Sequence, residues 1–433
     1  MNFQKYAFQS LRFFIVPALI FAIGCGSSSM APTLTSITQT PAASSASPGT
    51  SSGSVNNGSG SSSTGGSPGT GGAGATTPAS QPVGFLYVAL NDGYSIWTNV
   101  SNSGHGSIAG FSIAADGSLQ TTPGSPYAGP AASLATNAAA SSLYSASQST
   151  LDVNHINADG SLATTETFNP QPLSPSIGIY EDLSFNAVSH FLYALTIHGA
   201  GDNFFEIYKA GADSSLATSG SEQATVTTAH PSFTPDGARA YEPYCYHFDG
   251  EILGYTASAS GQLVAFNTSA TVSNLGTPYP ACPHALSISS DGARIAAQLN
   301  AVNSTVAALA LYTINSDGTL SQQGNPVTTT AQGADIAWDP SGRYIAVAAK
   351  DGLWIYNAAL GSTATVMGQG PIVTGPIDHL AFNKAGTLLF ATNASSQILY
   401  AFTFNSTSGT VTTAPGSPHT MSLPPYALVV SEP

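Results

Sequence analysis

Histidine and aspartate residues recur at one position of an internal repeat. Each repeat opens with a short strand that closes on an apolar residue, and three positions earlier stand Asp182, His230, Ala285, Asp335 and His379. Because repeats of one kind place equivalent residues around a common axis, these side chains should converge. Imidazole beside carboxylate can move protons, so His379, His230, Asp335 and the adjacent Asp378 are the candidate catalytic groups.

Further polar residues fall on the same side of the predicted repeats, where second strands end or first strands begin. We interpret them as a ligand-binding rim made of Asp182, His284, Glu242, Tyr244 and His247. The alternative is structural, because Asp at the end of a strand commonly accepts hydrogen bonds from loop amides. The residues therefore predict one face on which ionisable groups gather, with hydrolysis or ligand binding as its use.

Two cysteines, Cys245 and Cys282, fall on this face in neighbouring repeats. We expect a disulfide between them, with two buried free thiols as the alternative. A metal site that includes His230, His247 and His284 is conceivable, but no HExxH or CxxC spacing accompanies it. We expect neither a metal nor a cofactor, since P-loop, dinucleotide and GxSxG patterns are also absent.

The elements that must position these residues are short strands. First strands with Asp-Gly-type turns read SFTPDGAR (232–239), SISSDGAR (287–294) and AWDPSGR (337–343), and FLYVALND (85–92) opens a series of second strands. Second and third strands each occur seven times, and the first strand missing at residue 84 is supplied by YALVV (426–430). This predicts an all-β, seven-bladed β-propeller over 84–433, its first blade closed by the C-terminal strand.

The N-terminus carries a separate signal. Lys5 and Arg12 precede an apolar run over 13–23, which is too short to span a bilayer as a helix but suits a signal peptide over 1–24. The run ends in Ala-Ile-Gly-Cys at 22–25, which resembles the lipobox of bacterial lipoproteins. The resemblance implies lipidation at Cys25 and an acyl anchor in the lipid bilayer, on an exported protein of the periplasm or outer membrane of a Gram-negative bacterium. A plain signal peptide with an incidental cysteine is the alternative.

Residues 25–83 are rich in Ser, Gly and Pro, and such a composition predicts a flexible linker between anchor and propeller. Charged residues make up only 7% of the chain, with 8 Lys and Arg against 22 Asp and Glu. Nucleic-acid binding is excluded, because it requires clustered cations to neutralise phosphate.

From residue 84 the chain resembles the lactonase-type seven-bladed propellers, which include bacterial six-phosphogluconolactonases. The resemblance rests on IAGFSIAADGSL (108–119) and on the recurrent loops PGSPYAGP (123–130), GTPYPACP (276–283) and PGSPHT (415–420). Active members of that family carry Pro-Arg-His before a first strand and Glu at the end of the next strand. The nearest match here is Ile-Asp-His at 377–379 with Ala394 at the Glu position, so the family's arginine is missing.

Two functions follow as expectations. The first is a binding or interaction module of the cell envelope, whose ligand is a glycan, a peptide or a protein. The alternative is a divergent lactone hydrolase that opens its substrate at the mouth of the propeller channel. The two differ in whether the histidines and aspartates meet in one place.

Overall fold

The computed structural model describes residues 81–91, 106–147, 150–169, 172–173, 176–177, 179–198, 202–224, 230–246, 249–266, 269–277, 281–359 and 363–433. The predicted signal peptide, Cys25, nearly all of the linker and His247 lie outside these ranges. Within them, no helix has the length and apolar character that crossing a membrane requires.

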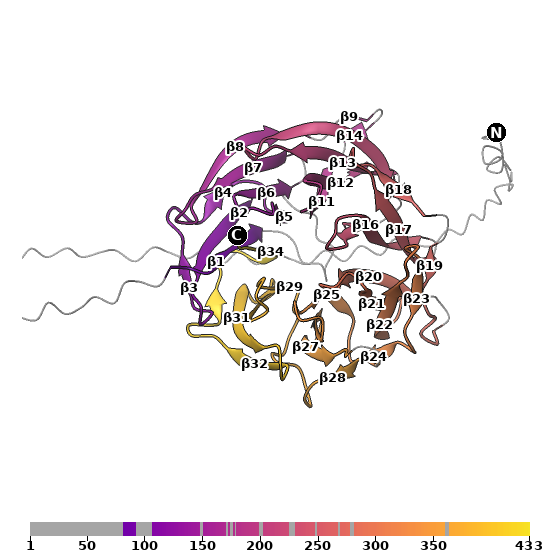
Figure 1. The fold of residues 1–433 in the computed structure, drawn as a ribbon. Coiled ribbons are helices and arrows are strands. Elements are labelled where there is room, and N and C mark those ends of the chain that lie inside the picture. Colours follow the sequence, from indigo (N-terminus) through magenta and orange to yellow (C-terminus); the bar gives the residue numbers. More distant parts are fainter. Residues whose placement is uncertain are drawn as a thin grey trace, which may run out of the picture. The chain divides into compact units, whose positions relative to one another are not determined.

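Seven antiparallel sheets are arranged around a central axis, with β5, β11, β20, β25, β29 and β34 among the strands nearest the centre (Figure 1). Blade 1 contains β34 (Pro425–Ser431), β1 (Gly84–Asn91), β2 (Gly106–Ile113), β3 (Leu119–Thr121) and the short β4 (Tyr127–Ala128). Blade 2 contains β5 (Ser133–Thr136), β6 (Ser142–Ser147), β7 (Thr150–Ile156) and β8 (Leu162–Phe168). A small hairpin of β9 (Pro172–Leu173) and β10 (Ser176–Ile177) follows.

The remaining blades repeat the same order from the axis outward. Blade 3 contains β11 (Ile179–Asn186), β12 (Phe191–His198), β13 (Asp202–Ala210) and β14 (Leu216–Ala224). Blade 4 contains β15 (Ser232–Phe233), β16 (Arg239–Tyr246), β17 (Asp249–Ala257), β18 (Leu263–Ala265) and β19 (Ala270–Thr271). Blade 5 contains β20 (Ala281–Ile288), β21 (Arg294–Ala301), β22 (Ala307–Ile314), β23 (Leu320–Gln322) and β24 (Val327–Thr329).

Blade 6 contains β25 (Gly333–Trp338), β26 (Tyr344–Ala349), β27 (Gly352–Asn357) and β28 (Thr365–Val366). Blade 7 contains β29 (His379–Phe382), β30 (Leu388–Asn393), β31 (Ile398–Asn405), β32 (Thr410–Thr413) and β33 (His419–Thr420). The C-terminal strand β34 pairs with β1, for example Leu86 opposite Val430. The predicted seven-bladed fold and its closure by the C-terminal strand are therefore confirmed.

Packing between neighbouring blades explains the low charge. Every residue of β26 is buried, because the blades on either side cover both faces of its sheet. Tyrosines of second strands also cross to the next blade, as Tyr87 Oη donates to the carbonyl of Gly160 at 2.9 Å. Gly160 has φ +78°, and a Cβ there would come within 2.3 Å of the Phe85 ring, so the Asp-Gly turn requires glycine.

Candidate active site

One position recurs in each innermost strand, or in the residues just before it. It lies opposite the end of the second strand, as in the pairs Asp182–Leu195, Asp335–Ala348 and His379–Thr392. From blade 2 round to blade 1 the equivalent residues are Ser133, Asp182, His230, Ala285, Asp335, His379 and Ala427. We call this set the inner ring. It reads as one serine followed by Asp-His-Ala twice.

Strand irregularities shape this ring. The register shifts between Tyr180 and Asp182 in β11, between Pro283 and Ala285 in β20, and between Gly333 and Asp335 in β25. A bulge inserts one residue and re-aims the side chains beside it. In blade 5 the inserted residue is His284, which adds a third histidine next to the inner ring.

The first histidine–aspartate pair joins blades 3 and 4. His230 Nδ1 lies 2.6 Å from Asp182 Oδ2, and the His230 amide donates to the same oxygen at 3.2 Å. Asp182 Oδ1 accepts from Ser133 Oγ at 2.7 Å and from the Leu183 amide at 2.9 Å. The His230 side chain keeps 45% of its surface exposed, so its far edge is open to water.

Electrostatics tighten this pair. Burial among the inner strands favours neutral forms of both groups, but the two opposite charges and their hydrogen bond outweigh it. The pKa of Asp182 is therefore lowered from its ordinary value, and the pKa of His230 is raised from its ordinary value of 6.5. The pair favours a carboxylate holding an imidazolium.

The second pair joins blades 6 and 7 more loosely. His379 Nδ1 lies 3.7 Å from Asp335 Oδ2, which also accepts from the Leu380 amide at 3.1 Å. His379 Nε2 is buried and has no hydrogen-bond partner among the described residues, and the Tyr426 ring packs edge-on at 5.7 Å between centroids. Burial opposes the charge of His379, but Asp335 and more distant carboxylates outweigh it, so the pKa is raised.

His284 behaves in the opposite way. Its surroundings penalise the charged ring and the positive charge of His379 adds to this, so its pKa falls below 6.5 despite the attraction of Asp335. The charge of Asp335 acts on His230, His284 and His379 alike, and Asp182 acts on His379 from across the axis. The charge of Asp335 thus acts on three histidines, whose pKa values are moved in different directions.

Two predicted site residues are buried away from solvent, although the charge of Asp378 still acts on His379. Asp378 is 1% exposed, and its Oδ2 accepts from the Ala394 amide at 2.7 Å, while burial raises its pKa. Glu242 is fully buried and accepts from Tyr255 Oη at 2.7 Å, so it belongs to the packing of blade 4 and not to a rim. The assignments of Asp378 to the catalytic set and of Glu242 to the rim are corrected accordingly.

The remaining predicted residues divide as follows. Tyr244 is partly exposed near the end of β16, and His247 is outside the described residues. Tyr426, which covers His379, was not anticipated. The sequence could have indicated Tyr426 in one way only, because it directly precedes the inner-ring residue of the closing strand. His284 and Asp378 directly precede the inner-ring residues of blades 5 and 7.

Cys245 and Cys282 are joined by a disulfide with their Cα atoms 5.4 Å apart. The bond links β16 of blade 4 to β20 of blade 5, two residues before His284. Among the residues that the structure places, no cluster of three or more His, Cys, Asp or Glu side chains could hold a metal ion.

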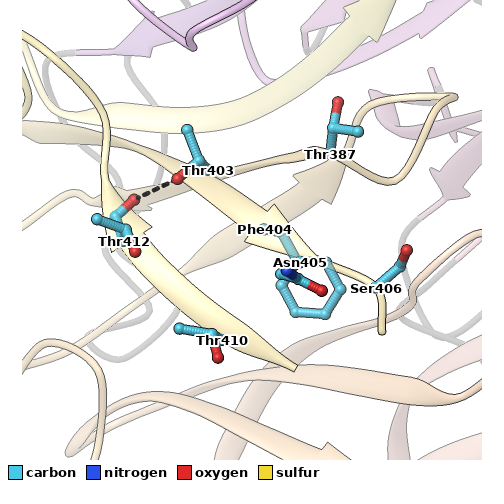
Figure 2. A pocket seen from close by; sticks show the side chains of 7 residues that line it. All are labelled: Thr387, Thr403, Phe404, Asn405, Ser406, Thr410 and Thr412. Carbon is cyan, nitrogen blue, oxygen red and sulfur yellow. Dashed lines mark hydrogen bonds between the residues drawn. The ribbon is translucent and has the colours of Figure 1, made fainter. Parts of the chain in front are cut away.

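Pockets elsewhere are of a different kind. One of 550 Å³ lies over β31 and β32 of blade 7, where Figure 2 shows Phe404 among hydroxyl and amide side chains. Another of 230 Å³ is lined by Tyr241, Phe266 and Gly318 between blades 4 and 5. Neither is lined by a residue of the inner ring, and neither gathers ionisable groups.

No protein-family model and no curated protein matches the chain. Among solved structures it is similar to the periplasmic gluconolactonase of Pseudomonas aeruginosa, with a TM-score of 0.58 and 17% identity over 80% of this chain and 99% of that one. A candidate 6-phosphogluconolactonase of Bacteroides uniformis gives a TM-score of 0.61 and 17% identity over 80% and 99% of the two chains. One from Bacteroides fragilis gives 0.57 and 15% over 82% and 99%. At these identities the likeness concerns architecture, and the chain has the seven-bladed fold of the lactonase-like propellers.

Proposed function

We propose that the protein is a hydrolase that opens lactone rings at the inner ring. The observation that carries this is the His230–Asp182 pair, with 2.6 Å between Nδ1 and Oδ2 and 45% of the imidazole exposed, together with His284, which a bulge inserts in the next blade. The pKa of His230 is raised and that of His284 is lowered, so His230 favours the charged form and His284 the neutral form. Environments that push the pKa values of like groups apart separate a base from an acid. Lactone hydrolysis needs both, because water must lose a proton while the carbonyl oxygen gains negative charge.

In the proposed step, neutral His284 takes a proton from a water molecule as the water oxygen bonds to the lactone carbonyl carbon. The His230 imidazolium, held through Nδ1 by Asp182, directs its exposed Nε2 edge at the carbonyl oxygen and stabilises the oxyanion. The intermediate then breaks its bond to the ring oxygen, which receives the proton from His284. The product is an open hydroxy acid, and both histidines return to their starting forms.

His379 and Asp335 have a supporting part in this scheme. The Nε2 of His379 is buried, its ring packs edge-on against Tyr426, and Asp335 is held by the amides of Ile336 and Leu380. We assign to Asp335 the electrostatic positioning of the three rings. Of the two histidines that the sequence offers as catalytic candidates, we assign the direct part to His230, whose side chain is 45% exposed, and not to His379, at 28%.

A binding module of the cell envelope remains the second candidate. Asp182 and Asp335 both accept backbone amides of neighbouring strands, which is the structural use expected of Asp at a strand end. Under this alternative the inner ring would bind a glycan, peptide or protein ligand without catalysing a reaction on it.

We also propose export and anchoring through Cys25. The lipobox-like sequence supports this, as does the disulfide, because disulfides persist in oxidising compartments. The name of the Pseudomonas aeruginosa neighbour as a periplasmic protein is compatible with it. Replacing Cys25 by Ser should move the protein from the membrane fraction to the soluble fraction of the producing cell. Retention of the variant in the membrane would contradict the anchor.

The test of the hydrolase is a pH-stat assay of the purified full chain with five- and six-membered lactones, compared with spontaneous opening. His230→Asn should lower kcat by about 100-fold or more, the usual range for loss of a general acid or base. His155→Asn is the matched control, since His155 is an exposed residue of β7 away from the inner ring. A wild-type rate equal to the spontaneous rate, or a fully active His230→Asn variant, would favour the binding module.

A further inference from the structure

We infer that the substrate is an uncharged lactone, bearing neither phosphate nor carboxylate. This rests on the hydrolase proposed above and adds the chemical class of its substrate. The inference depends on where every Lys and Arg residue of the chain lies, and the amino-acid sequence shows all of them.

Of the 8 Lys and Arg residues, Lys5 and Arg12 precede the propeller. The remaining six are Lys209, Arg239, Arg294, Arg343, Lys350 and Lys384. All six are described by the structure. No loop outside the described ranges from residue 81 onward contains Lys or Arg, so none can supply either residue to the inner ring.

Three of the six stand where second strands begin, at the opposite end from the inner ring. Arg239 donates to the carbonyl of Asn315 at 3.3 Å, and Arg294 donates to the carbonyl of Ala358 at 2.7 Å. Arg343 lies over the ring of Tyr344, 5.6 Å from its centroid. These guanidinium groups tie each blade to its neighbour or to itself, and they cannot reach a substrate at the other end of the strands.

The lysines are placed similarly, with one exception. Lys209 donates to the carbonyl of Ser189, and Lys384 donates to that of Pro433 at 3.0 Å, both at the far face. Lys350 stands in the turn between β26 and β27, on the same face as the inner ring. It is exposed and lies one strand outward from Asp335, so it is the natural control for the inference.

The inner ring itself has no net positive charge to offer. Each imidazolium is matched by the carboxylate beside it, Asp182 for His230 and Asp335 for His379. The proposed step uses the exposed edge of His230 for the carbonyl oxygen, so a phosphate or carboxylate elsewhere on the substrate would approach these two carboxylates without a further counter-ion. Like charges brought together in this way disfavour binding. A neutral polyol lactone meets no such penalty, because hydroxyl groups can donate to the carboxylates.

One of the two alanines of the inner ring offers a way to weaken the preference for neutral over anionic lactones. Ala427 lies between His379 of blade 7 and Ser133 of blade 2, with no carboxylate at either neighbouring ring position. An arginine there would add the first uncompensated cation to the ring. Glutamine is the control for the added length, because it resembles arginine in reach but carries no charge.

The experiment compares glucono-δ-lactone with its 6-phosphate at low ionic strength, using the purified full chain. We expect kcat/KM for the neutral lactone to exceed that for the phosphate by about 100-fold, from the like-charge cost. Ala427→Arg should reduce this ratio by about 10-fold, whereas Ala427→Gln and Lys350→Gln should leave it unchanged.

The outcomes separate the two proposals. Hydrolysis of both lactones with similar kcat/KM, or preference for the phosphate, would overturn the neutral-substrate inference and leave the hydrolase intact. A ratio that changes in Lys350→Gln would overturn it too, because Lys350 would then be an anion-binding residue. Hydrolysis of neither lactone above the spontaneous rate would end the hydrolase proposal and the inference together.

Discussion

The two histidine–aspartate pairs of the inner ring occupy equivalent places three blades apart, yet they differ in geometry. In the first, 2.6 Å separates His230 Nδ1 from Asp182 Oδ2, and in the second 3.7 Å separates His379 Nδ1 from Asp335 Oδ2. Ser133 Oγ reaches Asp182 in the first pair, whereas the covering ring of Tyr426 packs on the histidine of the second. The same two residue types therefore form different contacts in the two pairs, because the neighbouring blades supply Ser133 in one case and Tyr426 in the other.

The comparison suggests a division of work. The first pair is tightly bonded and leaves the far edge of its imidazole in water, which is the arrangement that proton transfer requires. In the second pair the Nε2 atom of the imidazole is buried, and the carboxylate influences all three histidines. One repeated sequence pattern thus yields a reactive pair in one part of the propeller and a positioning pair in another.

The largest expected difference between the pairs is in stability. Asp182→Ala removes the acceptor of Ser133 Oγ, the Leu183 amide and His230, and we expect a loss of about 3 kcal/mol in the free energy of unfolding. Asp335→Ala removes two amide contacts and a long ion pair, and about 1–2 kcal/mol should be lost. Urea unfolding followed by fluorescence measures both. Equal losses, or the reverse order, would show that these distances and hydrogen bonds do not set the strength of the pairs.

The second difference should appear in the pH dependence of kcat. Activity requires neutral His284, whose pKa is below 6.5, and charged His230, whose pKa is above 6.5. The rate should therefore fall as acid protonates His284 and fall again as alkali deprotonates His230, giving a bell-shaped profile.

Asp182→Asn removes the charge that raises the pKa of His230, so the alkaline limb should move to lower pH. The acid limb should stay in place, since Asp182 is not among the groups that act on His284. A profile in which both limbs move, or in which neither does, would show that deprotonation of His230 does not cause the alkaline limb.

The sequence predicted the fold and the inner ring for the same reason. A recurring spacing places equivalent residues at the same register position of each blade, so counting along the repeat located Asp182, His230, Asp335 and His379. Adjacent residues in extended chain point to opposite sides. Asp378, one residue before a ring position, therefore faces the protein interior, and Glu242 turns into the packing of its blade.

What the sequence could not supply is the difference between the pairs. The covering of His379 depends on a register shift in the closing strand that places Tyr426 beside it, and the third histidine depends on the shift that inserts His284. Bulges of this kind are set by contacts with the neighbouring blades, which no local pattern records. The spacing of the repeat determines which residues belong to the inner ring. The register shifts determine which of these residues water can reach.

The smallest expected effect tests this last point. His379→Asn should lower kcat by less than about 10-fold, because its Nε2 is buried against Tyr426 and takes no part in the proton transfers. Diethyl pyrocarbonate followed by mass spectrometry should modify His230 readily and leave His379 protected, and Tyr426→Ala should make His379 reactive without changing the modification of His230. If His379 reacts first in the wild-type protein, or if His379→Asn is as damaging as His230→Asn, then the second pair carries the chemistry and the roles of the two pairs are exchanged.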